Sequence, residues 1–335
     1  MRAMILERTA NLADRPEPLR SVELPIPEPG TGEVLLEVLA CGVCHTELDE
    51  IEGRTPPPSL PVILGHEVVG RVAKQWRGAD RHALGDRLGV GWIYRSTGAD
   101  DENLAPEFTA TGRDVNGGYA EFMTVSQDYA YPISDQFNDV EAAPLLCAGA
   151  IGHRALRLSG ITDGQTLGLT GFGISAHLVL QLARYLYPST TIAVFARDPE
   201  VREFAYQCGA HWAGDITDQA PEALHAIIDT TPAWQPVVEA LANLRPGGRL
   251  VINAIRKEDV DKGSLAKLSY HEHLWMEREI KSVANITARD IAEFLEIAAS
   301  IPIRPQVTRY PLEDANRALL ELRAGGTKGA KVLVP

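Results

Sequence analysis

The amino-acid sequence predicts an α/β protein with a β-rich part followed by a doubly wound parallel sheet. The length of 335 residues exceeds what one hydrophobic core usually organises, which favours two domains. The pattern of short apolar runs changes near residue 164 to strand, glycine-rich turn, helix and strand. The composition, 45% hydrophobic and 23% charged, is that of an ordinary globular protein and excludes disorder, collagen and coiled coil as the main architecture.

The β-rich part extends to about residue 150. Short apolar runs such as residues 33–38 and 68–72 predict strands, and clusters of proline and glycine separate them, for example at residues 25–30 and 56–58. A partly open barrel or a sandwich is the natural arrangement for such strands.

The parallel sheet is predicted from alternating strands and helices after residue 164. Strands are expected at 166–170, 191–195, 226–229 and 249–253. The first helix has apolar side chains at Ile174, Leu178, Val179, Leu182 and Leu186; a second should end at Gly209, and a third lies around 237–244. This βαβα order predicts a parallel, doubly wound sheet. Near the end, Thr287 can cap a helix, and another helix should end at Gly325 before a strand at 331–334.

Net charge and cysteine content limit the classes of binding partner and the roles of the cysteines. The 32 Lys and Arg against 45 Asp and Glu give a formal charge of -13, which argues against nucleic acid or an anionic membrane as the main partner. The N-terminal segment has no apolar core typical of a signal or transit peptide, so we expect a cytoplasmic protein. Four cysteines are too few for a disulfide scaffold, which leaves metal ligand, nucleophile or buried thiol open for each.

A glycine-rich turn indicates a dinucleotide site. Gly171, Phe172, Gly173 and Ile174 directly follow a predicted strand and open a helix, and Ala176 holds the third position of the pattern. In such a turn the first glycine makes the tight bend and the second lets a pyrophosphate approach the helix N-terminus. The motif alone is weak, because many glycine-rich turns bind nothing, but its place in a βαβ unit favours nucleotide binding.

The end of the second strand bears on the choice of cofactor. Ala196 and Arg197 stand where a small residue and a neighbouring arginine would admit the 2′-phosphate of NADP, so we expect NADP over NAD. Asp198 is close enough to be the acid that would hold the ribose of NAD instead. Arg197 could also be a solvated loop charge.

Three residues far apart in the sequence are candidate metal ligands. Cys44 follows Cys41 in a C-x-x-C motif that fits a redox pair, two zinc ligands, or one ligand and a buried thiol. An isolated histidine such as His66 is more often a hydrogen-bonded structural residue than a ligand. An isolated cysteine among apolar neighbours, such as Cys147, is more often part of the hydrophobic core. A set of polar residues lies near these candidates: His45, Thr46, Glu47, Asp49 and Glu67. They fit an exposed acidic turn, or they surround a metal, where they would orient a ligand and transfer a proton.

Taken in order, the segments 41–48 (CGVCHTEL), 65–67 (GHE), 116–121 (NGGYAE) and 171–173 (GFG) make the chain resemble a zinc-dependent medium-chain alcohol dehydrogenase, of the medium-chain dehydrogenase/reductase superfamily. The resemblance runs from end to end. It implies a GroES-like catalytic domain formed by residues 1–150 and 286–335, and a Rossmann NAD(P)-binding domain formed by residues 151–285. It also implies an active site in the cleft between them.

The resemblance assigns roles that come from the family and not from this sequence. Cys44, His66 and Cys147 match the catalytic zinc ligands, and Glu67 a conditional fourth ligand. Thr46 matches the hydroxyl that receives the alcohol proton, and Glu47 the carboxylate that orients the histidine. Cofactor contacts are implied at His45, Thr46, Thr230, Ala254 and Asn285 besides the turn and the second strand. Cys41 matches no ligand, which leaves it and Cys208 as packing thiols.

Two departures from the family stand out. Members with a structural zinc carry four cysteines in a lobe between the first and third catalytic ligands, but this chain has none between Cys44 and Cys147, and Thr97 and Ala105 stand near their places. We therefore expect no structural zinc and a lobe held by turn chemistry and packing. Asp49 replaces the histidine that often ends the proton relay, and an aspartate is a weak base unless its site raises its pKa.

The expected activity is the interconversion of a primary or secondary alcohol and its aldehyde or ketone, with hydride passing to or from NAD(P). Trp92 and Tyr94 suggest an aromatic entrance for medium apolar or aromatic alcohols. We expect a homodimer or homotetramer. Two alternatives remain open: a zinc-free quinone or enone reductase of the same superfamily, and a non-enzymatic nucleotide-binding thiol sensor.

Overall fold

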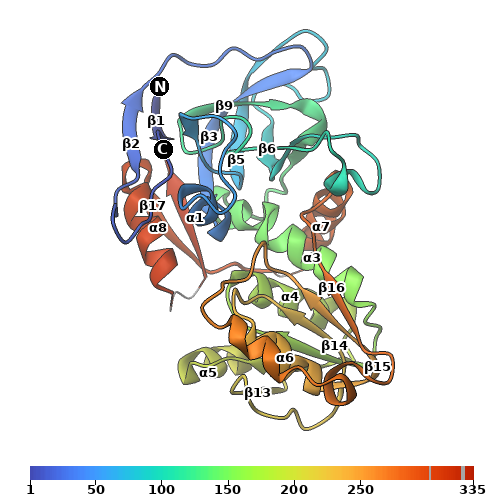
Figure 1. Cartoon of the computed structure of the whole chain (residues 1–335). Helices are drawn as coiled ribbons and strands as arrows, with labels where there is room; N and C mark the ends of the chain where they lie inside the picture. Colours follow the sequence, from blue (N-terminus) through green and yellow to red (C-terminus); the bar gives the residue numbers. More distant parts are fainter. Residues whose placement is uncertain (302, 326–328) are drawn as a thin grey trace. The chain divides into compact units, whose positions relative to one another are not determined.

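A computed structural model describes residues 1–301, 303–325 and 329–335 (Figure 1). The chain divides into two compact units. Unit 1 comprises Met1–Ala150 and Ile286–Pro335, and unit 2 comprises Ile151–Asn285. Among the described residues, no helix combines the length and the apolar character that a membrane span requires.

Unit 1 is built mainly on antiparallel strands. A small sheet has the order β2 (Leu19–Glu23), β1 (Arg2–Leu6), β4 (Val62–Ile63). The larger sheet has the order β10 (Ala130–Pro132), β6 (Arg87–Val90), β5 (Val68–Gln75), β3 (Glu33–Val43), β18 (Ala330–Val334), β17 (Val307–Pro311), and β9 (Phe122–Ser126) also pairs with β3. The C-terminal strand β18 thus lies beside β3, which joins the two ends of the sequence in one sheet.

Helices and a lobe complete unit 1. Its helical elements are α1 (His45–Ile51), η2 (Gln127–Tyr129), α2 (Asp139–Ala142), η3 (Ala143–Leu146), the first residues of α3 (Ala148–Ser159), α7 (Ala288–Ser300), η6 (Leu312–Asp314) and α8 (Ala315–Ala324). The lobe contains the paired strands β7 (Ile93–Arg95) and β8 (Thr109–Ala110) with η1 (Glu102–Leu104) between them. As predicted, Thr287 caps α7, and α8 ends at Gly325.

The core of unit 1 lies between its sheets and α8. Cys41 belongs to this core and is fully buried. Its Sγ packs against the backbone of Gly65, since a Cβ added to that glycine would lie 2.8 Å from the sulfur. Cys41 is therefore a packing thiol, as predicted, and the C-x-x-C motif is not a matched pair of ligands. Cys208 is half-buried at the end of its helix in unit 2.

Unit 2 is a six-stranded parallel sheet in which every neighbouring pair of strands is parallel (Figure 1). The order is β13 (Trp212–Gly214), β12 (Thr191–Phe195), β11 (Thr166–Thr170), β14 (Leu224–Asp229), β15 (Leu244–Ile252), β16 (Glu279–Ser282). The order reverses at β11, which pairs with β12 on one side and β14 on the other. The predicted α/β class and doubly wound sheet are confirmed.

The helices of unit 2 are the rest of α3 from Ile151 onward, α4 (Ile174–Leu186), α5 (Pro199–Cys208), α6 (Gln235–Ala242), η4 (Lys262–Lys267) and η5 (Tyr270–Leu274). Gly209 ends α5 in the left-handed region at φ 98°, as its predicted role requires. The third helix begins and ends two residues earlier than expected because Pro236 fixes its first turn. Strand β15 begins earlier because Leu244 pairs with Leu224 on β14.

Candidate functional site

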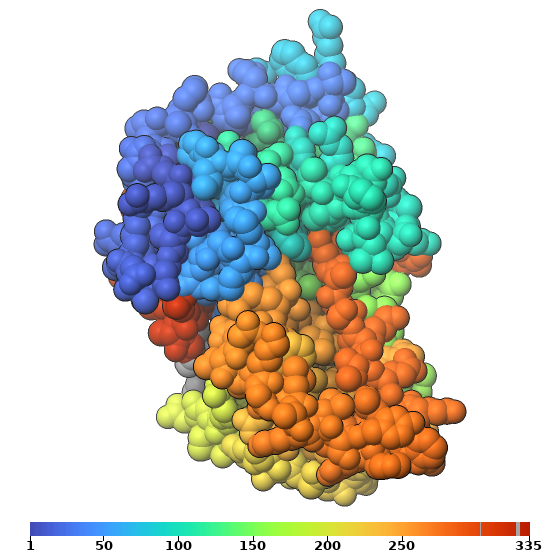
Figure 2. Space-filling view, viewed as in Figure 1, coloured from blue at the N-terminus to red at the C-terminus, as the bar shows by residue number. Residues whose placement is uncertain are grey.

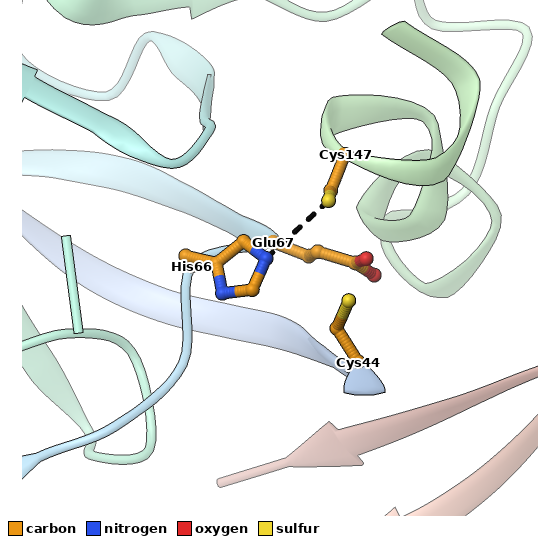
Figure 3. Close-up of side chains that lie close together, drawn as sticks. All are labelled: Cys44, His66, Glu67 and Cys147. Carbon is orange, nitrogen blue, oxygen red and sulfur yellow. Dashed lines mark hydrogen bonds between the residues drawn. The ribbon is translucent and has the colours of Figure 1, made fainter. Parts of the chain in front are cut away.

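Four side chains from separate segments of unit 1 point toward one another (Figure 3). Cys44 directly follows β3, His66 and Glu67 directly precede β5, and Cys147 lies between η3 and α3. Their ligand atoms all lie within 4.8 Å of one another, and His66 Nε2 is 3.3 Å from Cys147 Sγ. The structure thus gathers the three predicted ligands and the conditional fourth in one place.

Glu47 connects two members of this cluster. One carboxylate oxygen, Oε1, lies 2.6 Å from His66 Nδ1, and the other accepts a hydrogen bond of 2.6 Å from the backbone N–H of Cys44. Glu47 is fully buried at the third position of α1, so its geometry is fixed by the start of that helix. The contact with Nδ1 leaves Nε2 of His66 facing the cluster, as a metal ligand requires.

The cluster favours a thiolate at Cys44. Hydrogen bonding from Cys147, together with His66, holds the pKa of Cys44 well below its usual range although burial opposes the shift. The hydrogen bond to Cys44, with burial, raises the pKa of Cys147 well above its usual value. Burial and the neighbouring Cys44 also raise the pKa of Glu67. Without a cation, Cys44, Cys147 and Glu67 therefore cannot all be ionised at once, because their negative charges would repel one another in a buried site.

These residues fit a zinc ion. Two thiols, an imidazole and a carboxylate are the donor types that zinc prefers, and bonds of about 2.0–2.3 Å place neighbouring ligands of a tetrahedron roughly 3–4 Å apart. The ligand atoms here all lie within 4.8 Å of one another, a spacing close to that range. The buried, charge-rich cluster and the orientation of His66 by Glu47 both match a metal site, and a divalent cation would relieve the repulsion among Cys44, Cys147 and Glu67.

The other catalytic candidates lie on α1. Thr46 is buried, and its Oγ1 is 3.5 Å from Cys44 Sγ, whereas His45 is exposed at the first position of the helix. Asp49 is buried and accepts a hydrogen bond of 2.7 Å from Arg54 Nε. The sequence did not indicate this arginine partner, because Arg54 lies in a turn beyond the end of α1.

An aromatic row stands beside the cluster. The ring centroid of Trp92 is 6.0 Å from that of His66, and the ring of Phe108 is 5.9 Å from Trp92. The hydroxyl of Tyr94 instead donates to Glu33. Of the two aromatic residues predicted at the substrate entrance, Trp92 therefore adjoins His66, whereas Tyr94 contacts Glu33 and Phe108 continues the row in its place. No periodic pattern marks Phe108, which lies in the lobe.

The glycine-rich turn of unit 2 leaves the start of α4 open. Gly171 has φ +75°, and a Cβ there would lie 3.0 Å from Thr230 Oγ1 and 2.9 Å from Thr231 Cγ2, so this position requires glycine. Gly173 is the N-cap of α4, and a Cβ on it would meet nothing within 4 Å. The free N–H groups of Ile174 and the following residues can therefore receive an anionic group.

Phe172, between the two glycines, turns inward. Its side chain is buried, stacks on His177 with ring centroids 6.2 Å apart, and packs edge-on against Phe204. Only the backbone of Phe172 is thus available for a cofactor contact. The side chain anchors the turn to α4 and α5.

At the end of β12, Ala196 is buried and Arg197 is exposed. The carboxylate of Asp198 accepts a hydrogen bond of 2.8 Å from Glu200 N and caps α5, so it already has a structural partner. Arg202 Nη1 donates to the carbonyl oxygens of Ala196 (2.7 Å) and Arg197 (2.9 Å), a second arginine that the sequence pattern did not reveal.

The remaining cofactor candidates also lie at carboxyl ends of strands in unit 2. Thr230 follows β14, and its hydroxyl donates to Thr170 O at 3.1 Å. Ala254 follows β15, and Asn285, with φ +63°, is the last residue of unit 2. The predicted residues therefore form two groups, one around the cluster and α1 in unit 1, and one that follows β11, β12, β14, β15 and β16 in unit 2.

Comparison with known proteins decides the family. Residues 30–135 match the model of the alcohol dehydrogenase GroES-like domain. The chain is 40% identical over 328 residues to "Probable alcohol dehydrogenase AdhA" of Mycobacterium tuberculosis, covering 95% of this chain and 93% of that protein. The chain belongs to the medium-chain alcohol dehydrogenase family. It is an oxidoreductase of the alcohol dehydrogenase type, as the sequence predicted.

Further relatives of this alcohol dehydrogenase agree. An alcohol dehydrogenase of Geobacillus stearothermophilus is 32% identical over 330 residues, covering 94% of each chain. A structure described as a zinc-binding dehydrogenase from Sinorhizobium meliloti bound to NADP has a TM-score of 0.86 at 25% identity, covering 100% of this chain and 99% of that one.

The lobe of this alcohol dehydrogenase is held by a buried carboxylate. Glu102 is 1% exposed; its Oε2 accepts hydrogen bonds from Tyr129 OH (2.8 Å) and Gly98 N (3.0 Å), and its Oε1 accepts one from Ala288 N (2.6 Å). Ala288 is the first residue of α7, so one side chain ties the lobe to a helix N-terminus. The sequence predicted turn chemistry here but did not single out Glu102.

Proposed function

We propose that Cys44, His66 and Cys147 bind one catalytic zinc ion, with Glu67 as a conditional fourth ligand. Unit 1 is then the catalytic domain and unit 2 the NAD(P)-binding domain. The observation that carries this proposal is the buried cluster of four donors within 4.8 Å, with His66 oriented by Glu47. The family uses an NAD(P) cofactor, and the open turn at Gly171–Gly173 supports its binding to unit 2.

A bound zinc ion supplies a Lewis acid that polarises the oxygen of the alcohol or carbonyl substrate. The residues around it would do the rest. Glu47 keeps Nε2 of His66 directed at the metal, and Thr46, whose hydroxyl lies 3.5 Å from Cys44 Sγ, would receive the proton of the alcohol. Asp49 remains the candidate for the next step of proton transfer, with Arg54 holding its carboxylate in one orientation.

The proposed cofactor is NADP in preference to NAD. Ala196 leaves room beside the ribose, and Arg197 is exposed where a 2′-phosphate would lie. The alternative acid, Asp198, is engaged as the cap of α5. A ratio of kcat/KM for NADP over NAD well above one supports this proposal, and a ratio below one contradicts it.

For the substrate we propose a medium apolar or aromatic alcohol, because Trp92 and Phe108 form an aromatic row beside His66. Dispersion and edge-to-face contacts would favour a ring or chain over ethanol. We also propose that the enzyme is a cytoplasmic homodimer or homotetramer, as expected from the sequence.

The deciding experiment measures zinc content and alcohol oxidation on the same samples of wild type, Cys147→Ser and Cys208→Ser. Cys208 is a half-buried cysteine outside the cluster and serves as the matched control. We expect about one zinc per chain with activity in wild type and Cys208→Ser, and loss of both in Cys147→Ser. Wild type that is active on enones or quinones with well under one zinc per chain would instead identify a zinc-free reductase.

A further inference from the structure

A buried ion pair lies at the carboxyl end of the parallel sheet in unit 2. Asp229, the last residue of β14, is fully buried, and the side chain of Lys257 is 7% exposed. Lys257 Nζ donates to Asp229 Oδ2, to Thr231 O (2.7 Å) and to Ala233 O (3.0 Å). Because an ammonium group has three N–H donors, all of them are used inside the protein. Lys257 is therefore built into the fold and does not present a free charge.

Two further contacts join the same pair of segments. Glu258 N donates to Pro232 O at 2.6 Å, and one carboxylate oxygen of Asp261 accepts hydrogen bonds of 2.8 Å from the N–H groups of Trp234 and Gln235 at the start of α6. Segment 253–261, which follows β15, is thus fastened to segment 230–235, which follows β14. We call the contacts of Asp229, Lys257 and Asp261 the loop clamp.

The loop clamp reaches the glycine-rich turn. Asp229 lies opposite Thr170 on β11, and its Oδ1 accepts hydrogen bonds of 2.7 Å from the hydroxyls of Thr170 and Thr231. Thr230 and Thr231 in turn stand against Gly171, at the distances given above for its missing Cβ. A continuous set of contacts therefore runs from Lys257 to the turn, at the point where the strand order reverses.

Polar contacts, more than apolar packing, hold segment 253–261 in place. Its residues Val260 and Ile255 are 87% and 41% exposed, so these apolar side chains bury little surface. Figure 2 shows orange atoms, from the sequence around and beyond residue 250, on the visible face of unit 2. A buried Lys–Asp pair is no better for stability than apolar residues of the same size, because both charges are desolvated. The ion pair instead fixes the positions of segments 230–235 and 253–261 relative to each other.

We propose that Lys257 is a positioning residue that, through the loop clamp, pre-forms the nicotinamide half of the cofactor site. In a doubly wound sheet the ribose of the adenosine half is read at the end of the second strand, here β12, so the β14 and β15 side serves the other half. The residues held in place are Thr230, Thr231 and Ala254. This proposal rests on the proposed binding of NAD(P) to unit 2.

The test compares two ligands on Lys257→Met and on the double variant Asp229→Asn/Lys257→Met, which removes both charges and so avoids leaving a buried, unpaired carboxylate. The dissociation constant of NADPH is measured by fluorescence titration, and that of 2′,5′-ADP, which carries only the adenosine half, by competition or calorimetry. We expect NADPH binding to weaken at least ten-fold and 2′,5′-ADP binding to change less than two-fold. Lys262→Met, an exposed lysine just beyond the clamp, is the matched control and should behave as wild type.

Equal weakening of both ligands in both variants would mean a general loss of structure in unit 2, and no weakening of either would mean that the clamp is irrelevant to the cofactor. Each result overturns the proposal. Hydrogen exchange of the free protein gives an independent readout: peptides covering 230–235 and 253–261 should exchange at least ten-fold faster in Lys257→Met, and unchanged exchange would also refute the clamp. Wild type that binds neither NADPH nor NADH would refute the cofactor assignment itself, and this outcome is distinct from a failure confined to the variants.

Discussion

Replacing Glu102 by glutamine should loosen the lobe of unit 1. In the native protein one carboxylate accepts three hydrogen bonds, from Tyr129 OH, Gly98 N and Ala288 N. Glutamine keeps the shape of the side chain but has only one acceptor oxygen. If that oxygen stays with Tyr129 and Gly98, the amide NH₂ faces the N–H of Ala288; if it turns to Ala288, two donors on the other side lose their acceptor.

The magnitude follows from these contacts. A hydrogen bond to a charged group contributes about 1.5–3 kcal/mol, and an unsatisfied buried donor costs about 1–3 kcal/mol. Loss of the negative charge at the first turn of α7 adds about 0.3–1 kcal/mol. Because Thr287 still caps α7 and some relaxation is expected, we predict a net loss of about 2–4 kcal/mol for the local stability of the lobe.

The assay is hydrogen exchange of peptides covering residues 93–110, with urea unfolding of the whole chain as a second measure. A loss of about 2 kcal/mol or more accelerates exchange through local opening roughly 30-fold or more, since 1.4 kcal/mol is a factor of ten. Asp101→Asn changes the exposed neighbouring acid and should leave exchange within about two-fold of wild type. If Glu102→Gln exchanges like Asp101→Asn, the carboxylate does not hold the lobe and the reasoning is wrong.

Three further predictions concern the site and the nucleotide turn. Glu47→Gln should weaken zinc binding about 10–100-fold in a chelator competition, because the group that orients His66 is lost; unchanged affinity would contradict this role. Phe108→Ala should lower kcat/KM for benzyl alcohol relative to ethanol by about ten-fold or more, and an unchanged ratio would remove Phe108 from the substrate wall. Burial lowers the pKa of His177 from about 6.5 to about 4, so the native state resists its protonation and should lose about 3 kcal/mol of stability as the pH falls from 7 to 4. His177→Phe should flatten that part of the pH profile, and an identical slope in the variant would disprove the assignment.

The sequence predicted the parallel sheet of unit 2 well where strand and helix patterns are strong. Strands 166–170 and 191–195 match β11 and β12 residue for residue, because short, mostly buried apolar runs leave little choice. Strand β16 was not predicted. Its four residues, Glu279–Ser282, are all exposed and lie at the edge of the sheet, so no apolar pattern marks them, and only pairing with β15 makes them a strand.

The candidate site shows the same division. The cluster could be predicted because the order of the motifs related Cys44, His66 and Cys147 to a known family, although each of these residues alone fits a structural role as well. Glu102 and Lys257 could not be predicted, since an acid in a turn and a lysine in the charged run Arg256–Asp259 are both typical of exposed loops. Ala288 lies 186 residues from Glu102 in the sequence, and Asp229 lies 28 residues from Lys257, so only the fold brings these pairs together.

Both buried charges solve the same physical problem. Segment 253–261 and the parts of the lobe outside β7, β8 and η1 are irregular, so they cannot satisfy all of their backbone groups within a helix or a sheet. Val260 and Leu104 are 87% and 66% exposed, so these apolar side chains bury little surface. A single ionised side chain with two or three backbone or hydroxyl partners fixes such a segment with directional bonds. In the lobe, which contains no cysteine, such bonds link Glu102 to Tyr129 and to the start of α7. None of the groups bonded to the Glu102 carboxylate belongs to the cluster of Cys44, His66, Glu67 and Cys147, so we expect treatment with a chelator to leave the shape of the lobe unchanged.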